Sequence, residues 1–324
     1  MAAGSPLARW LVRDWTALAL SCCGLVSQEP EGVFQVRSQA PDGRWSVAEH
    51  GGTDSSDVRA SALMTLACIA DAERAQVYVK AVGPAIDWLR KLPDKRGRIG
   101  FRDDPEWGVD HAIVTCCLLE WARSHRDDDV LVSAAAATNA LVTLLQQLNG
   151  KASSELVVWS RACLAAIRKA RADDSANRWG GFPDGALERA CALGHASATN
   201  AQERAAALLL AVLGDRGLRT EQLREVAWPS EDIAEPMTAL YLTMAYALAT
   251  EPGRRAAKEA DGLWSVAVER AEAVRVMAHT KGKLRGSWDP KGDFGQRYGR
   301  IGTTGAAGLL LLTRWRKCYL ALWM

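Results

Sequence analysis

Two kinds of helical segment alternate along the chain, and this alternation most constrains the fold. Segments rich in Ala, Leu, Arg and Glu recur with the 3.6-residue spacing of a helix, whereas the period-two pattern of strands is almost absent. One kind, such as 57–71, is apolar on all sides and rich in small residues. The other kind, such as 77–92, has one polar face. We therefore predict an all-α fold in which the first kind lies inside and the second kind covers it.

Six pairs of these segments fill the chain. The expected inner helices span 57–71, 109–125, 155–172, 200–213, 235–250 and 303–317. The expected outer helices precede them at about 7–26, 77–92, 130–149, 184–196, 217–227 and 255–281. One pair therefore takes one sixth of the 324 residues, and this regular period indicates a repeat architecture. We predict a single domain over 1–324, an (α/α)6 toroid, in which 1–40 form an N-terminal helix and linker and 41–324 form the ring.

Short glycine-containing turns with an aromatic residue separate several of these helices. They lie at 42–45, 97–101, 178–182 and 286–290. The separation of Trp45 from Phe101 is close to one period, and that of Trp179 from Trp288 is close to two periods. An indole can lie flat over adjacent helix ends while its N–H donates to a free carbonyl. We therefore interpret the high tryptophan content, 13 Trp against five Tyr and four Phe, as mainly structural.

The charge balance and the cysteines limit the possible functions. Lys and Arg number 40 and Asp and Glu 38, so no basic excess exists for binding nucleic acid through its phosphates. The eight cysteines lie mostly in apolar helical segments without zinc-ligand spacing, which indicates buried thiols in a reducing compartment. No run reaches the roughly 18 apolar residues of a membrane span. We expect a cytoplasmic protein without a transmembrane segment or a nucleic-acid partner.

Two stretches resemble the prenyltransferase and squalene-oxidase repeat. They are Asp-Gly-Arg-Trp at 42–45 followed by 57–63, and Gly-Ser-Trp-Asp-Pro-Lys-Gly at 286–292 running through 298–300 to Thr303 and Thr304. The resemblance covers most of the chain from about residue 40, is weak over 125–175, and is closest to small bacterial repeat proteins over 236–316. It implies the α/α toroid of protein prenyltransferase β-subunits and squalene–hopene cyclases. That toroid serves cyclases, transferases and non-catalytic binders alike, so it does not fix the activity.

The resemblance places the acid motif of class II terpene cyclases, Asp-x-Asp-Asp, on Ser55-Ser56-Asp57-Val58. The middle aspartate of that motif protonates the substrate, which requires a carboxyl kept protonated by its surroundings. Here only Asp57 is acidic, and the nearby Arg59 is expected to pair with an acid and keep it ionised. We expect Asp57 to cap a buried helix. A general acid is the alternative role.

The metal patterns of related enzymes are also incomplete. Protein prenyltransferases hold zinc through an Asp, a Cys and a His, and although Asp110 and His111 begin an inner helix, the Asp-x-Cys part of that pattern is missing. His195 lies four residues after Cys191 without a third ligand. The acidic runs at 103–106, on a proline-containing loop, and at 127–129 are expected to be solvated or to cap helices. We therefore expect neither a metal site nor a cofactor.

Polar residues at the starts of the inner helices, with Tyr241 within the fifth and Arg297 and Arg300 in the loop before the sixth, are expected to form a rim around an apolar cavity, as in many ligand sites. They are Asp110, His111, Asn200, Glu203, Tyr241, Arg297, Arg300, Thr303 and Thr304. The favoured hypothesis is a non-enzymatic toroid that binds a protein or peptide partner, for example as a bacterial regulator or scaffold. The alternative is an unorthodox class II terpene cyclase or prenyl-binding enzyme with Asp57 as its acid and an isoprenoid-like ligand. A wide aromatic cavity favours the enzyme, and a filled centre favours the binder.

Overall fold

The fold is helical throughout the part that the computed structural model describes, residues 34–53, 57–72, 79–100, 106–174, 177–214, 236–249, 284 and 286–315. This part contains ten α-helices, of which the first is the short α2 (Phe34–Arg37), a short 3-10 helix η3 (Ala48–His50) and no strand. The all-α class predicted from the sequence is therefore confirmed.

Six long helices correspond to the expected inner helices. They are α3 (Asp57–Ala72), α5 (Trp107–His125), α7 (Ser154–Asp173), α9 (Ala201–Gly214), α11 (Pro236–Ala249) and α13 (Gly292–Trp315). Five of them begin within two residues of the expected positions, and α13 begins earlier than expected, at Gly292 rather than Thr303. The glycines of 292–302 resemble a loop in the sequence, but Phe294, Tyr298 and Ile301 are buried, and packing makes the segment helical with a break at Gly299.

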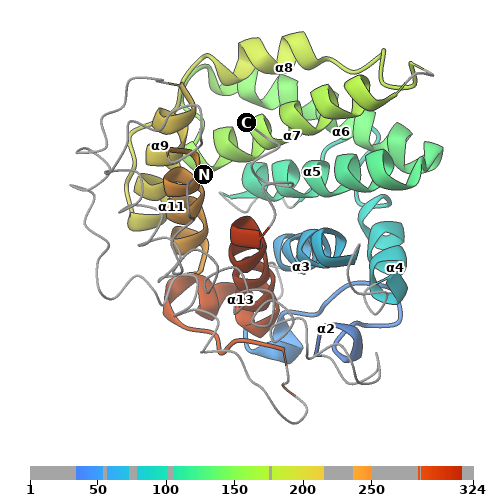
Figure 1. Cartoon of the computed structure of the whole chain (residues 1–324), viewed down its shortest axis with the longest axis vertical. Coiled ribbons are helices and arrows are strands. Elements are labelled where there is room, and N and C mark those ends of the chain that lie inside the picture. Colours follow the sequence, from blue (N-terminus) through green and yellow to red (C-terminus); the bar gives the residue numbers. More distant parts are fainter. Residues whose placement is uncertain are drawn as a thin grey trace, which may run out of the picture.

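These six helices contact one another in chain order. α3 contacts α5, α5 contacts α7, α7 contacts α9, α9 contacts α11 and α11 contacts α13, and α13 returns to make extensive contact with α3. In Figure 1 the neighbours of this series lie side by side in the same order. Each helix of the series therefore has two partners from the same series.

Three shorter or more amphipathic helices pack against this series. They are α4 (Val79–Leu89), α6 (Asp128–Leu148) and α8 (Asp184–Cys191), which contact α3, α5 and α7. The expected outer helices at 7–26, 217–227 and 255–281 lie outside the described residues. By length and composition alone α6 could cross a membrane, which is weak evidence because core helices of water-soluble proteins pass the same test.

The turns before α3 and α5 are built alike. In each turn a backbone N–H donates across it, Ala40 to Arg44 and Asp94 to Arg98. Gly43 and Gly97 both have positive φ, and a Cβ on either would lie 2.1 to 2.3 Å from a carbonyl oxygen of the following outer helix. Ile99 is therefore the structural equivalent of Trp45, since each stands two places after its glycine. The expected match of Trp45 to Phe101 is wrong by two positions.

The turn at Trp179 occupies a different place. It follows the last turn of α7 and precedes α8, whereas Trp45 and Trp288 precede the inner helices α3 and α13. Trp179 therefore does not repeat the position of Trp45, and its separation from Trp288 is not two periods of one feature. The expected hydrogen bond from an indole N–H to a backbone carbonyl is present at Trp45, whose N–H donates to the carbonyl of Gln35 at 2.8 Å.

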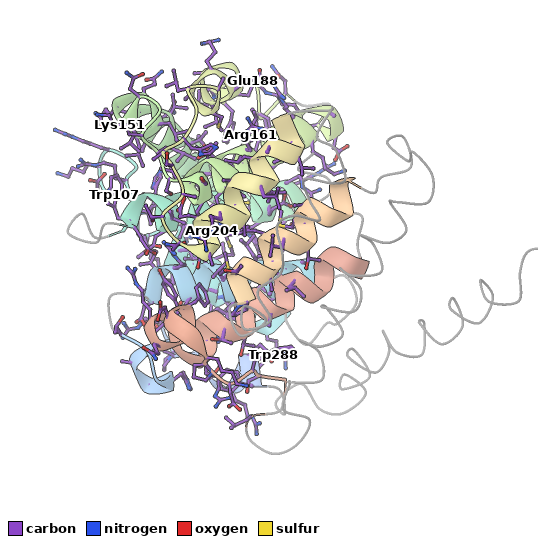
Figure 2. All side chains as sticks on the ribbon, turned by 90° about the vertical axis from the view of Figure 1, so that its left-hand side faces the viewer. Trp107, Lys151, Arg161, Glu188, Arg204 and Trp288 are labelled. Atoms are coloured by element: carbon purple, nitrogen blue, oxygen red, sulfur yellow. The ribbon has the colours of Figure 1, made fainter. Side chains whose placement is uncertain are left out.

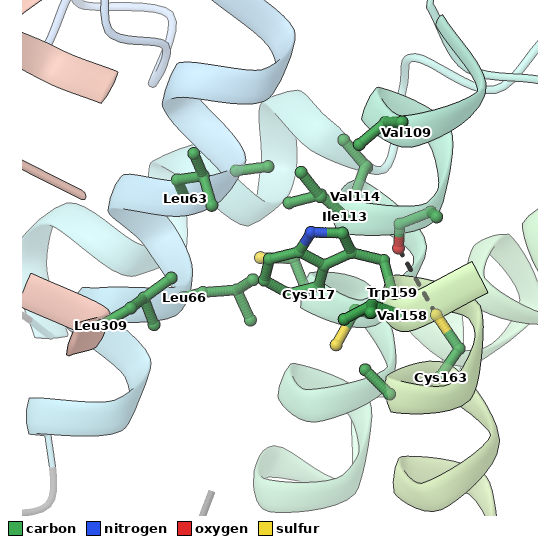
Figure 3. Close-up of a cluster of buried hydrophobic side chains, with 14 of the residues drawn as sticks. Leu63, Leu66, Val109, Ile113, Val114, Cys117, Val158, Trp159, Cys163 and Leu309 are labelled. Atoms are coloured by element: carbon green, nitrogen blue, oxygen red, sulfur yellow. Dashed lines mark hydrogen bonds between the residues drawn. The ribbon is translucent and has the colours of Figure 1, made fainter. Parts of the chain in front are cut away.

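A continuous apolar core joins the inner helices. Figure 3 shows Trp159 of α7 among Leu63 and Leu66 of α3 and Ile113 and Cys117 of α5. The Cys163 thiol donates to the carbonyl of Ala112 at 3.4 Å and so packs α7 against α5. Five cysteines within the described residues are buried and unbridged, as expected: Cys68, Cys116, Cys117, Cys163 and Cys191.

Candidate functional site

The starts of the inner helices bring charged side chains together around Arg59 of α3. The Arg59 side chain is fully buried. Its Nε donates to Asp110 Oδ1 at 2.5 Å, and its Nη1 lies 2.7 Å from Glu106 Oε2 and 3.8 Å from Glu155 Oε2. The Tyr298 ring lies under the guanidinium, 4.9 Å from ring centre to Cζ. We name this set the Arg59 cluster: Arg59, Glu106, Asp110, Glu155, Tyr241, Arg297 and Tyr298.

Glu106, at the start of α5, is the accessible carboxylate of the Arg59 cluster. Its side chain is 40% exposed, against 5% for Asp110 and 4% for Glu155. Besides Arg59, its Oε2 accepts from the Tyr298 hydroxyl at 2.8 Å, and its Oε1 pairs with Arg297 at 2.7 Å. Glu106 and the half-buried Arg297 therefore form the solvent-facing edge of the cluster.

Glu155, in the first turn of α7, is the buried carboxylate of the cluster. Its Oε1 accepts from the Tyr241 hydroxyl at 2.6 Å, and its Oε2 accepts from the Gln202 amide at 2.9 Å. Burial raises the pKa of Glu155, and the nearby Glu106 raises it further, against the opposing effect of Arg59. Tyr241 in turn accepts from the Trp159 indole at 2.8 Å, which connects the cluster to the apolar core.

The protonation states in the cluster follow from burial and charge. Burial alone would lower the pKa of Arg59, but the surrounding acidic groups, Asp110 first, raise it well above its ordinary value. Burial raises the pKa of both Tyr241 and Tyr298. Arg59 is therefore a permanent cation and the two tyrosines are hydroxyl donors.

Three of the rim residues expected from the sequence, Asp110, Tyr241 and Arg297, lie in the Arg59 cluster. Two others cap helix starts beside it. The Asn200 side chain accepts from the N–H of Glu203 at 2.8 Å, and Glu203 accepts from the N–H of Ser154 at 2.9 Å. Figure 2 shows that Trp107, at the start of α5, and Lys151, just before α7, lie on the same side of the molecule.

The other four expected rim residues bind loops or their own helix. His111 accepts from the N–H of Ile99 at 3.1 Å, and its other ring nitrogen lies 2.9 Å from the carbonyl of Ala137. Burial lowers the pKa of His111 to about 4, so the ring is neutral near pH 7. Thr304 accepts from the N–H of Trp288, and Thr303 donates to the carbonyl of Gly299. Arg300 binds the side chains of Ser287 and Asp289.

Asp57 binds the turn before α3 and not the Arg59 cluster. Its Oδ1 accepts from the N–H of Val47 at 2.6 Å, and its Oδ2 accepts from Arg44 at 3.1 Å. These contacts show the carboxylate fixing the preceding loop, and the expected helix cap stays a prediction. Arg59 does pair with acids as expected, and its partners are on α5 and α7.

Four cluster residues were missing from the sequence-based rim: Arg59, Glu106, Glu155 and Tyr298. Glu106 was expected to be a solvated or capping charge of the acidic run at 103–106, and Glu155 was not singled out, because an acid near a helix start commonly favours the positive end of the helix dipole. The available signal was Arg59 itself, a charged residue on a helix that is otherwise apolar on all sides. Among the described residues, no group of three His, Cys, Asp or Glu side chains is arranged to hold a metal ion.

No protein-family model and no curated protein sequence matches the chain. Among solved structures, the chain is similar to one described as a novel α-amylase from Clostridium perfringens. The TM-score is 0.50 at 10% sequence identity, and the match covers 90% of this chain and 99% of that one. At this identity the similarity concerns the fold alone.

Proposed function

We propose that the chain is an (α/α)6 toroid that binds a segment of a partner protein or a peptide without transforming it. The toroid is supported by the order of contacts, in which each inner helix contacts the next and α13 returns to α3. In such an arrangement the helix starts meet at one end, where a partner can contact several helices at once. The Arg59 cluster marks this end.

One observation supports the binding role: the charged side chains of the Arg59 cluster form ion pairs and hydrogen bonds with one another and with neighbouring side chains. Arg59 holds Asp110 and Glu106, and the oxygens of Glu155 accept from Tyr241 and Gln202. A catalytic acid must reach the substrate with its proton, whereas these buried carboxylates are occupied as acceptors. Within the cluster, Glu106 and Arg297 keep 40% and 30% of their side chains exposed. This edge offers a carboxylate acceptor and a guanidinium donor in fixed positions, which suits recognition of a peptide.

Selection of peptides tests this proposal. A displayed library of random peptides is panned against the immobilised protein, and recovered peptides are measured by fluorescence anisotropy. We expect Glu106→Gln to weaken their binding at least tenfold, about 1.4 kcal/mol. Glu188→Gln is the matched control, because Glu188 is also an exposed partner of an arginine but belongs to α8. Failure to enrich any peptide, or equal effects of the two changes, would contradict the proposal.

A glycoside hydrolase is the second candidate, favoured by the raised pKa of Glu155 beside a second carboxylate, Glu106. Such enzymes use one carboxyl with a raised pKa and a second carboxylate across the scissile bond. The structural neighbour from Clostridium perfringens is described as an α-amylase. This candidate predicts release of reducing ends from soluble starch, abolished by Glu155→Gln and by Glu106→Gln. If wild-type protein releases none above a heat-inactivated sample, the candidate is excluded for this substrate.

The cyclase alternative finds no comparable support. It requires Asp57 to give a proton to a ligand, and both oxygens of Asp57 accept hydrogen bonds from Val47 and Arg44. We therefore do not extend it beyond an expectation from the sequence.

A further inference from the structure

The break in α13 at Gly299 separates two parts of this helix that have different neighbours. Gly299 has φ 58° and ψ −164°, outside the helical region. After the break, Gly305 lies so close to α3 that a Cβ on it would meet the α3 backbone at 2.7 Å. Before the break, Arg297 and Tyr298 both bind Glu106. Packing on α3 therefore fixes the second part, and the direction of the first part depends on what holds the break.

A loop before α3, residues 50–53, packs into this break. The Thr53 N–H donates to the carbonyl oxygen of Arg297 at 3.0 Å, and the Thr53 hydroxyl donates to the same oxygen at 3.3 Å. In an uninterrupted helix this carbonyl accepts from the N–H four residues on, which is that of Ile301, beyond the break. Thr53 therefore supplies donors to the Arg297 carbonyl from outside the helix.

Two glycines allow the loop and the helix to approach each other. A Cβ on Gly52 would lie 2.7 Å from the carbonyl oxygen of Arg297 and 2.7 Å from the nitrogen of Gly299. A Cβ on Gly299 would lie 2.7 Å from the carbonyl oxygen of His50 and 2.9 Å from the nitrogen of Gly52. A side chain on either glycine would therefore push the two backbones apart.

Arg297 is held at both ends. Its backbone carbonyl accepts from Thr53, and its Nη1 lies 2.7 Å from Glu106 Oε1. Its guanidinium lies over the Tyr298 ring, 5.3 Å from Cζ to the ring centre. A long side chain that is held in place before binding loses less conformational entropy when a ligand binds. The contacts of the 50–53 loop with the Arg297 backbone therefore bear on affinity at the exposed edge of the Arg59 cluster.

We propose that Gly52 and Thr53 are positioning residues for the peptide site: by holding the break in α13, they place Arg297 against Glu106. This inference rests on the proposed function and specifies what keeps its exposed edge in shape. Neither residue needs to contact the peptide. Displacing the loop turns the first part of α13 and lowers the affinity for a peptide through Arg297.

Gly52→Ala and Gly51→Ala form a matched pair of variants. A Cβ added at Gly52 meets the break, whereas a Cβ added at Gly51 meets nothing within 4 Å. Gly51 has φ 85°, so an alanine there strains the same loop without touching α13. Gly51→Ala therefore controls for a loss of stability alone. Thr53→Val is a milder change at the break, because it removes the hydroxyl and keeps the N–H.

The first readout needs no peptide. It is the Arg297 Nε–H signal in ¹⁵N-labelled protein, assigned by its loss in Arg297→Lys. We expect this signal to shift in Gly52→Ala, to shift less but in the same direction in Thr53→Val, and to stay in place in Gly51→Ala. Equal shifts in the two glycine variants, or no shift in Gly52→Ala, would overturn the inference. If Gly52→Ala does not fold, the comparison of Thr53→Val with Gly51→Ala decides in the same way.

The second readout is the Kd of a selected peptide. We expect Gly52→Ala to weaken binding about fivefold through the loss of a pre-positioned side chain, and Gly51→Ala to bind as wild type. In the Arg297→Ala background, Gly52→Ala should change the Kd by less than about twofold, because the loop acts through Arg297. The same fivefold loss in that background would overturn positioning through Arg297.

The outcomes separate this inference from the proposed function. If peptides bind through Glu106 while the two glycine variants behave alike in both readouts, the proposed function stands and this inference fails. If no peptide is enriched while the Arg297 signal shifts only in the variants at the break, the positioning of Arg297 stands and the proposed function fails.

Discussion

Asp57 and Arg59 stand two residues apart in the first turn of α3 and serve different regions of the molecule. Asp57 faces the preceding turn, where it holds the Val47 N–H and Arg44. Arg59 faces the other inner helices, where it holds Asp110 and Glu106 of the α5 start. Residues two apart on a helix point about 200° away from each other. The pair therefore divides the start of α3 into a loop-fixing side and a charged side.

The difference locates the candidate site. An acid in a first turn on the loop side fixes backbone, whereas an acid on the charged side meets partners from other helices. His111 belongs to the loop side, because it fixes Ile99, and Asp110, one residue earlier, belongs to the charged side. The two sides should therefore respond differently to mutation, with the largest effects at Arg59.

Removing Arg59 should have the largest effect on stability. Arg59→Met leaves Asp110 and Glu155 buried without their cation, and breaking a buried ion pair from one side costs about 3–5 kcal/mol. Urea unfolding followed by tryptophan fluorescence measures the change. Arg300→Met is the control, because Arg300 pairs with the half-exposed Asp289, and such pairs contribute less than about 1 kcal/mol. Equal losses for the two variants would show that the cluster does not hold the helix starts together.

The loop side should show the next largest effect, as a dependence of stability on pH through His111. Its folded pKa of about 4 lies below the ordinary 6.5, so the unfolded chain binds the proton more tightly. The free energy of unfolding should therefore fall as the pH drops from 6.5 towards 4, by about 3 kcal/mol from this group. His111→Gln should lack that part of the fall. His50 and His125 are present in both proteins, so their contributions cancel. An identical pH dependence in the two proteins would exclude a buried neutral His111.

Asp57→Ala should have a smaller effect, confined to the loop side. The change removes the acceptor of the Val47 N–H and the partner of Arg44, and should cost about 1–3 kcal/mol. Asp57→Asn should cost less, because its amide oxygen can still accept from Val47. Neither variant should alter peptide binding, measured in the same anisotropy assay. A loss of binding without a loss of stability would move Asp57 to the charged side and revive its role as a functional acid.

The sequence predicted the class and the inner helices because both follow from periodicity. Helices apolar on all sides, such as α3 and α5, leave few alternatives for what lies inside. The turn equivalence was harder, because the residue that fills the Trp45 position before α5 is Ile99. The two turns are equivalent at their glycines, because Gly43 and Gly97 both lie against a carbonyl of an outer helix.

The candidate site was predictable only in part, because helix phase and partner identity are properties of packing. Asp110 was expected at the rim from its place at a helix start, Tyr241 from its place within the fifth inner helix, and Arg297 from its place in the loop before the sixth. Glu106 and Glu155 were not, because nothing in their local sequence distinguishes an acid that caps a helix from one that meets a buried arginine. Arg59 was expected to pair with a nearby acid, but that its partners are Asp110 and Glu106 of α5 and Glu155 of α7 depends on how the helices pack.

The central claim is that the exposed edge of the Arg59 cluster binds a peptide. The affinity of a selected peptide for variants of Arg297 and Arg300 tests this claim most directly. Both were expected at the rim, and they are three residues apart across the break at Gly299, but only Arg297 binds Glu106 at the exposed edge of the Arg59 cluster. The measurement is the Kd of one selected peptide for wild type, Arg297→Ala and Arg300→Ala. We predict a loss of at least tenfold, about 1.4 kcal/mol, for Arg297→Ala and a Kd close to wild type for Arg300→Ala. An equal loss in both variants, or none at Arg297, would contradict a binding site at this cluster.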